Sequence, residues 1–176
     1  IKISRIVVRG NDAEQSEVFL DERLLLSPGL AVHESYNMAV KMSDIARSCV
    51  LTAMGLMLSY DNDKAADVKT EETELDMYED KLGSFLVKLS ASALSDNDCA
   101  DVSKLLHNIG DFERIGDHAL NIRQSAKEMH EKGLTFSEHA TEEVNLLFSA
   151  LNEILTLAMD SFKDDDLDKA ARVEPL

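Results

Sequence analysis

The sequence predicts an all-α protein built as an up-and-down helical bundle. Four long segments carry apolar residues at three- and four-residue spacing, which is the period of an amphipathic helix. The 176 residues include only seven glycines, two prolines and three tyrosines and no tryptophan, fewer turn residues and aromatics than a many-stranded sandwich or barrel requires. Because isolated helices cannot bury one-sided apolar stripes, we expect these helices to pack against one another.

The charge balance disfavours several classes of function. Eighteen basic residues stand against 34 acidic ones, and the net charge is -16. Nucleic acid is an unsuitable partner because a phosphate backbone needs a footprint of Lys and Arg, and a basic pocket for free phosphate is disfavoured for the same reason. No segment has the ~20 apolar residues of a membrane span, and no secretion signal is visible. Cys49 is expected to be a buried, inert thiol, and two distant cysteines favour a reducing compartment.

Residues 1–26 are expected to form a basic leader or linker. Lys2, Arg5 and Arg9 are the charged residues among the first ten, whereas the rest of the chain has a balance of -19. A short basic segment before an acidic domain is typical of a juxtamembrane region on the cytoplasmic side. The alternative is an edge strand formed by the alternating apolar residues of 1–8.

Each helix that follows has its own boundary signal. A polar residue followed by proline begins the first helix, clusters of Ser, Asp and Asn begin the second and third, and a single serine begins the fourth. A glycine ends the third helix, and a run of aspartates ends the fourth and caps a fifth. The boundary residues are Ser27 with Pro28, Asp61 to Asp63, Ser95 to Asp98, Gly133, Ser137, and Asp164 to Asp166.

An internal repeat connects two of these boundaries. Residues 59–60 and 63–68 read Ser-Tyr and Asp-Lys-Ala-Ala-Asp-Val, and residues 161–162 and 168–173 read Ser-Phe and Asp-Lys-Ala-Ala-Arg-Val. Each copy follows a long amphipathic helix and begins the next one, which favours duplication over a chance match. We therefore expect residues 27–134 to form a three-helix unit and residues 135–176 to begin a second, truncated one.

Two acidic strips are predicted beside the buried seam of the first unit. Glu72, Asp76 and Glu79 share one face of the second helix, and Glu113 and Asp117 share one face of the third. If these helices pair, the strips meet, and their like charges repel unless protons or a cation relieve them. Clustered carboxylate oxygens suit Mg, Ca, Mn or iron.

Two glycines in the third helix bear on the same seam. Gly110 and Gly116 each cost about 1 kcal/mol relative to alanine inside a helix. The close approach of a neighbouring helix or ligand would justify that cost. The alternative is that both glycines are merely tolerated.

Other interpretations of the acidic strips remain open at this point. An acidic strip on a helix is commonly just a solvated face. We expect Arg114 to be an ion-pair partner within the bundle. We expect His118 to be a hydrogen-bonded histidine at the edge of the core. The sequence contains no Glu-x-x-His pair of a di-iron bundle, no nucleophile elbow and no glycine-rich phosphate loop. A carboxylate-bridged metallohydrolase is the remaining enzyme hypothesis.

The residues Glu113 to Asp117 resemble the E-R-I-x-D signature of the PhoU family. The spacing of Glu72, Asp76 and Glu79 is similar to the acidic motif on the second helix of that family, and the resemblance covers about residues 28–176. It implies a tandem of three-helix units and a regulatory, non-enzymatic role. It also implies a metal site, with iron as one option beside Mg, Mn, Ca and Zn. The ligands that it implies are Glu72, Asp76, Glu113 and Asp117, with Glu79 and Asp111 as additional ones.

The segment from Leu20 to Leu25, followed by Pro28, Leu30 and Ala31, is similar to the linker of sodium/phosphate cotransporter family proteins. In those proteins a PhoU-like domain follows the membrane spans. The resemblance implies a regulatory domain on the cytoplasmic side of the cell membrane. Its partner would be the transmembrane part of the same transporter or another membrane transport or signalling protein, and a homodimer is a further option. The alternatives are a free-standing PhoU-type regulator of phosphate uptake and signalling, and an acidic helical scaffold without metal.

Overall fold

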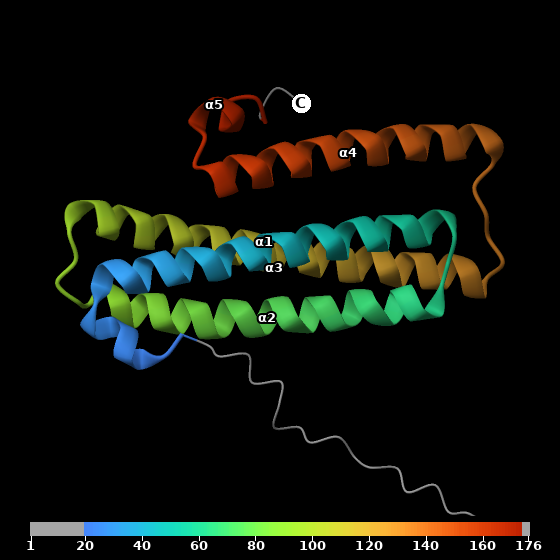
Figure 1. The fold of residues 1–176 in the computed structure, drawn as a ribbon. Helices are drawn as coiled ribbons and strands as arrows, with labels where there is room; N and C mark the ends of the chain where they lie inside the picture. The colour runs from blue at the N-terminus through green and yellow to red at the C-terminus, as the bar shows by residue number, and fades with distance from the viewer. Residues whose placement is uncertain (1–19, 174–176) are drawn as a thin grey trace, which may run out of the picture.

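The computed structural model describes residues 20–173, which form α-helices joined by short connections (Figure 1). The predicted all-α, up-and-down bundle is confirmed, and residues 20–173 contain no strand. None of the helices in this range is long and apolar enough to cross a membrane. Of the predicted leader, residues 1–26, the basic part and the alternative edge strand lie in residues 1–19, outside the described residues, whereas its end forms the short helix η1 (Glu22–Leu26). The elements are η1 (Glu22–Leu26), α1 (Pro28–Leu58), α2 (Asn62–Ser90), α3 (Asp96–Glu131), α4 (Glu138–Asp164) and α5 (Leu167–Ala170).

Side chains at the helix starts satisfy backbone groups that have no partner within the helix. The Asp61 carboxylate accepts hydrogen bonds from two backbone N–H groups in the first turn of α2. Ser95 and Asp98 form a reciprocal capping box at the start of α3, and Ser137 caps α4. After α3, Gly133 adopts a φ of +63°, which a side chain would disfavour. The boundaries predicted from these residues are confirmed.

The start of α1 differs from the prediction in one detail. Ser27 lies at the N-cap position, but its side chain makes no capping hydrogen bond. Its backbone N–H donates to the carbonyl of Leu24 at 2.8 Å and so closes η1. Pro28 at the beginning of α1 needs no cap of its own, because proline has no N–H group to satisfy.

Helices α1, α2 and α3 pack side by side as a three-helix bundle (Figure 1), and its interior holds two clusters of buried apolar residues. Each helix contributes fully buried side chains, among them Met42 from α1, Leu75 from α2 and Ile109 from α3. Burying one such side chain contributes about 1.5–3 kcal/mol. The second half of the bundle is filled by smaller residues, including Cys49, Val68 and Ala119. The three-helix bundle is thus the well-packed part of the molecule.

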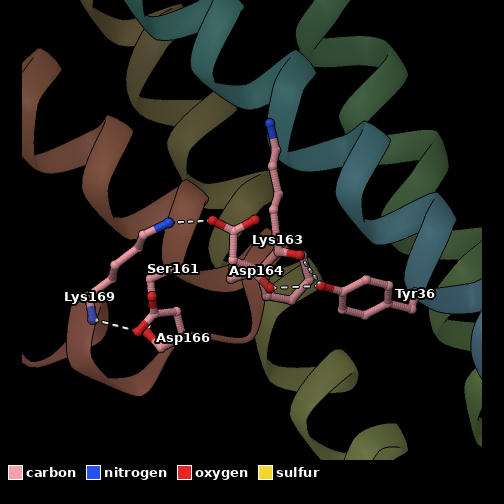
Figure 2. A network of polar contacts seen from close by, with 7 residues as sticks. Tyr36, Ser161, Lys163, Asp164, Asp166 and Lys169 are labelled. Atoms are coloured by element: carbon pink, nitrogen blue, oxygen red, sulfur yellow. Dashed lines mark hydrogen bonds and ion pairs between the residues drawn. The ribbon is translucent and has the colours of Figure 1, made fainter.

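Helix α4 lies beside α1, outside that bundle, and is attached mainly through its C-terminal half, while Phe148 packs against the second apolar cluster (Figure 1). Its buried residues are Met159, Ser161 and Phe162. The Phe162 ring packs 5.5 Å from that of Tyr36 and edge-on to that of Phe112 at 5.2 Å. The Tyr36 hydroxyl lies 2.8 Å from the carbonyl oxygens of both Phe162 and Lys163 (Figure 2). This contact fixes the end of α4 on α1.

The two repeated segments lie at comparable places in the fold. Asp61 begins α2 after the end of α1, and Asp166 begins α5 after the end of α4. Both aspartates accept hydrogen bonds from backbone N–H groups of the helix that follows. The duplication, with a first unit at residues 27–134 and the beginning of a second at 135–176, stays a prediction.

Candidate metal centre between α2 and α3

A close contact between α2 and α3 sets the position of the two acidic strips. A Cβ atom added to Gly116 would lie 2.6 Å from Cδ1 of Leu75, and Leu75 is completely buried. Gly116 therefore lets the leucine pack directly on the backbone of α3. Asp76 follows Leu75 in the sequence and Asp117 follows Gly116, so the same contact places both aspartates at one edge of the helix pair.

Gly110, the other glycine of α3, has no close neighbour. A Cβ atom added to Gly110 would meet nothing within 4 Å. The close approach expected for the pair of glycines thus occurs at Gly116, whereas Gly110 matches the alternative of a tolerated residue. Gly116 is the glycine that shapes the candidate site.

The strips border the buried seam, as the sequence predicts. Glu72, Glu79 and Glu113 are half-buried, while Asp76 and Asp117 are exposed. The glutamates therefore lie partly under the protein surface and the aspartates at its rim. An ion approaching from solvent would first meet the aspartates.

Carboxylates from both helices act on one another across the seam. The pKa of Glu113 on α3 is raised by burial, and then by the charges of Asp117, Asp76 and Glu79 and by a hydrogen bond with Asp117. The pKa of Glu72 on α2 is raised by burial, and then by the charges of Asp76 and Asp117. Thr73 and Lys69 oppose that shift without reversing it. Five carboxyl groups thus share one electrostatic field.

Asp111 is the predicted ligand that lies apart from this group. Its Oδ1 is 3.7 Å from Nη1 of Arg114, three residues later on the same helix, and both side chains are more than half exposed. Its charge is not among those that raise the pKa of Glu72 or Glu113. Arg114 is an ion-pair partner, as favoured, but it pairs within α3 and does not neutralise the strips.

The prediction for His118 is wrong. It was expected at the edge of the core, but the side chain is exposed. The reason is rotation along the helix: His118 is two residues after the buried Gly116, and two residues turn an α-helix by about 200°. His118 therefore faces away from the interior.

Glu71, which the sequence motifs did not single out, lies next to the strip on α2. Its Oε1 accepts a hydrogen bond from the Ser48 hydroxyl at 2.7 Å, and its Oε2 is buried without a hydrogen-bond partner. Burial, and then the charges of Glu71 and Glu72, raise the pKa of the nearby Cys49 to about 12. Cys49 is buried and protonated, in agreement with the prediction of an inert thiol. The two adjacent glutamates at positions 71 and 72 are the sequence feature that could have indicated the role of Glu71.

The donor chemistry of the five-carboxylate group suits a hard cation, because all its ligand atoms are oxygens. As the side chains stand, no three His, Cys, Asp or Glu side chains in residues 20–173 are gathered closely enough to hold a metal ion. Binding would therefore require the carboxylates to move closer together. The exposed aspartates are the members of the group with room to do so.

A comparison with known protein families covers both strips. Residues 39–126, half of the chain, match the PhoU domain family. No curated protein and no solved structure matches the chain. The matched range includes α2 in full, most of α1 and most of α3, and thus every residue of the candidate centre.

Proposed function

The chain belongs to the PhoU domain family, and we propose that it is the regulatory domain of a sodium-dependent phosphate cotransporter. PhoU domains have a regulatory, non-enzymatic role in phosphate transport. Here the domain would lie on the cytoplasmic side of the membrane and modulate transport through contact with the membrane part of the same protein. The basic residues of the leader and the linker-like segment from Leu20 to Ala31 support this context.

A free-standing PhoU-type regulator is the second candidate, because the match to the domain family supports it equally well. The two candidates differ in what precedes residue 1 in the gene. Codons for membrane spans there would establish the cotransporter, whereas a nearby start codon would establish the free-standing regulator.

We further propose that the strips bind a metal ion that links α2 to α3. The ligands would come from Glu72, Asp76 and Glu79 on α2 and from Glu113 and Asp117 on α3. The observation that carries this proposal is that carboxylates on each helix raise the pKa of a glutamate on the other. A bound cation would offset this repulsion, and its affinity would rise with pH as Glu72 and Glu113 lose their protons. Elemental analysis of the purified protein would identify the metal, with iron, Mn, Mg, Ca and Zn as the candidates.

Phosphate uptake by cells that carry the whole gene tests the regulatory role. The double variant Glu113→Gln/Asp117→Asn removes two charges from the centre and keeps the side-chain shapes. We expect uptake to respond abnormally to phosphate supply in this variant. Asp111→Asn is the matched control, because Asp111 is on the same helix and outside the group. Normal regulation in the double variant would contradict the proposed role of the centre.

A further inference from the structure

A cleft of about 440 Å³ lies at one end of the bundle, among the beginnings of α1 and α3 and the end of α4 (Figure 1). Its base consists of buried apolar residues from the three helices: Val32 from α1, Leu105 from α3 and Phe162 from α4. The Tyr36 ring also lines it, 5.5 Å from that of Phe162. The cleft therefore presents an apolar and aromatic surface, in the size range of about 300–1,000 Å³ that is usual for binding sites.

Both lysines that line the cleft are already paired. Lys104 pairs with Asp165, and Lys163 pairs with Asp44 on α1. Because these cations are engaged, the cleft is poorly suited to an anion.

Two aspartates of α3 give the cleft an uncompensated negative charge. Asp98 belongs to the capping box of α3, Asp101 follows one turn later, and both line the cleft. No Lys or Arg in residues 20–173 forms an ion pair with either of them, whereas Asp164 is paired with Lys169 (Figure 2). Carboxylates beside an aromatic and apolar surface suit Arg and Lys, whose stems pack on such a surface while their charged ends pair with the acids.

The chain that continues from α4 turns away from this cleft. Leu167 and Ala170 of α5 line a separate, smaller hollow together with Ala158 of α4. No residue of α5 lines the cleft. The helix that follows α4 is therefore not its occupant.

We propose that the cleft binds the basic leader of the same chain. Residues 1–9 carry Lys2, Arg5 and Arg9, no acidic residue, and mostly apolar residues between these charges. The basic groups would pair with Asp98 and Asp101, and the apolar residues would contact the base of the cleft. Because Tyr36 and Phe162 both line the cleft and fix α4 on α1, the leader would act on the attachment of α4.

The connection between the leader and the bundle is long enough for this contact. The stretch from Arg9 to Leu20 can span up to about 36 Å, whereas a helix with its side chains is about 10–12 Å wide. Leu20 is followed by η1, which packs on α1 and α2 at the same end of the bundle (Figure 1). A tethered segment has an effective concentration of the order of millimolar, so a modest affinity is sufficient. The inference does not rest on the proposed function, because no residue of the acidic strips lines the cleft.

Carbodiimide cross-linking of the full chain tests the proposal, because the reagent joins an amine to a carboxylate directly, with loss of water, where the two form an ion pair. Lys2 is the single lysine of residues 1–19. We expect mass spectrometry of the monomeric product to show Lys2 joined to Asp98 or Asp101. High salt should suppress this product, since it screens exposed charges.

Charge reversal at the cleft provides the matched comparison. Asp101→Lys should lower the yield of the Lys2–Asp98 product by about fivefold or more, because it replaces an attraction with a repulsion. Asp96→Lys makes the same change of charge in the first turn of α3 at a position that does not line the cleft, and it should leave most of the yield. Thermal melts of both variants would show that they fold, as expected at exposed positions.

Four results would overturn the proposal. The first is the absence of any product between Lys2 and the aspartates of the cleft, and the second is an equal loss in both variants. The third is an equal yield at Asp76 or Asp117, since the leader would then follow negative charge in general. The fourth is a product confined to cross-linked dimers, which would assign the contact to a second copy.

Discussion

Charged side chains serve different purposes at the end of α4 and at the seam of α2 and α3. Near the end of α4 each lysine faces an aspartate, in the pairs Lys163–Asp44, Lys169–Asp164 and Lys104–Asp165. At the seam, carboxylates face carboxylates, and the pKa of Glu113 is raised by charges of its own sign. The paired charges help to fix one helix on others. The unpaired ones work against the packing of their helices and remain available to an added cation.

The ion pairs near the end of α4 contribute less to its attachment than the buried contacts do. Exposed ion pairs contribute about 0–1 kcal/mol each. The buried Phe162 ring and the hydroxyl of Tyr36 therefore dominate the attachment. A similar division holds at the seam, where Leu75 and Gly116 provide the packing and the carboxylates oppose it.

The largest effect is expected from Phe162→Ala. Loss of a buried phenylalanine costs about 3–5 kcal/mol, and here it removes contacts to both Tyr36 and Phe112. Chemical denaturation would measure the loss, and hydrogen exchange should show the amides of α4 losing protection before those of α1 to α3. Leu146→Ala is the control, with a change within about 0.5 kcal/mol, since Leu146 is exposed. A cost below about 1 kcal/mol for Phe162→Ala would show that α4 is held by something else.

Gly116→Val should have the next largest effect, a loss of about 1–3 kcal/mol from overpacking against Leu75. The larger side chain also pushes α2 and α3 apart. NMR titration should then show the pKa of Glu113 closer to its ordinary value. Gly110→Ala provides the contrast, with a gain of up to about 1 kcal/mol, because that position is open and alanine favours the helix. A gain from Gly116→Val would mean that the contact with Leu75 is not tight.

Removing one charge should change stability in opposite directions in the two regions. Lys163→Met removes a partner of Asp44 and should cost up to about 1 kcal/mol. Glu113→Gln removes a repelled charge and should stabilise the metal-free protein. Denaturation of both variants in the presence of a chelator is the measurement. If both substitutions destabilise the protein, the carboxylates at the seam do not repel one another as described.

The smallest effect is expected in the dependence of stability on pH. The pKa values of Glu72 and Glu113 are raised above their ordinary value of 4.5, so the folded state holds these protons more tightly than the unfolded state does. Their contribution is fully present below pH 4.5 and is lost as the pH rises through the raised values. Subtracting the profile of Glu72→Gln/Glu113→Gln from that of the unchanged protein isolates it from the other carboxylates. A difference that grows with rising pH would contradict this sign.

The helix starts and the shared face of each acidic strip could be predicted because both depend on local spacing. Ser95 and Ser137 indicate where α3 and α4 begin, and the four-residue interval from Glu113 to Asp117 defines a shared helix face. A glycine inside a helix, here Gly116, predicts the close approach of a neighbouring group, which proves to be Leu75. These features need only the geometry of one helix.

The remaining features depend on how helices are rotated and which distant segments meet. The pairing of Asp111 with Arg114 and the exposure of His118 follow from the orientation of α3, which spacing alone does not give. The hydroxyl of Tyr36 meets the carbonyl of Phe162 across a separation of 126 residues. The domain limits and the metal ligands are still predictions.

The melting temperature with and without metal tests the central claim, that the strips on α2 and α3 form a single cation site. At about a thousandfold excess over Kd, an ion that binds only the folded protein adds about 4 kcal/mol of stability. We expect Mn²⁺, or another of the candidate ions, to raise the melting temperature of the unchanged protein and of Asp111→Asn. Asp76→Asn and Asp117→Asn, one on each helix, should both lose that response. A melting temperature that neither chelator nor any of these ions alters, or a response that survives in both variants, would contradict the claim.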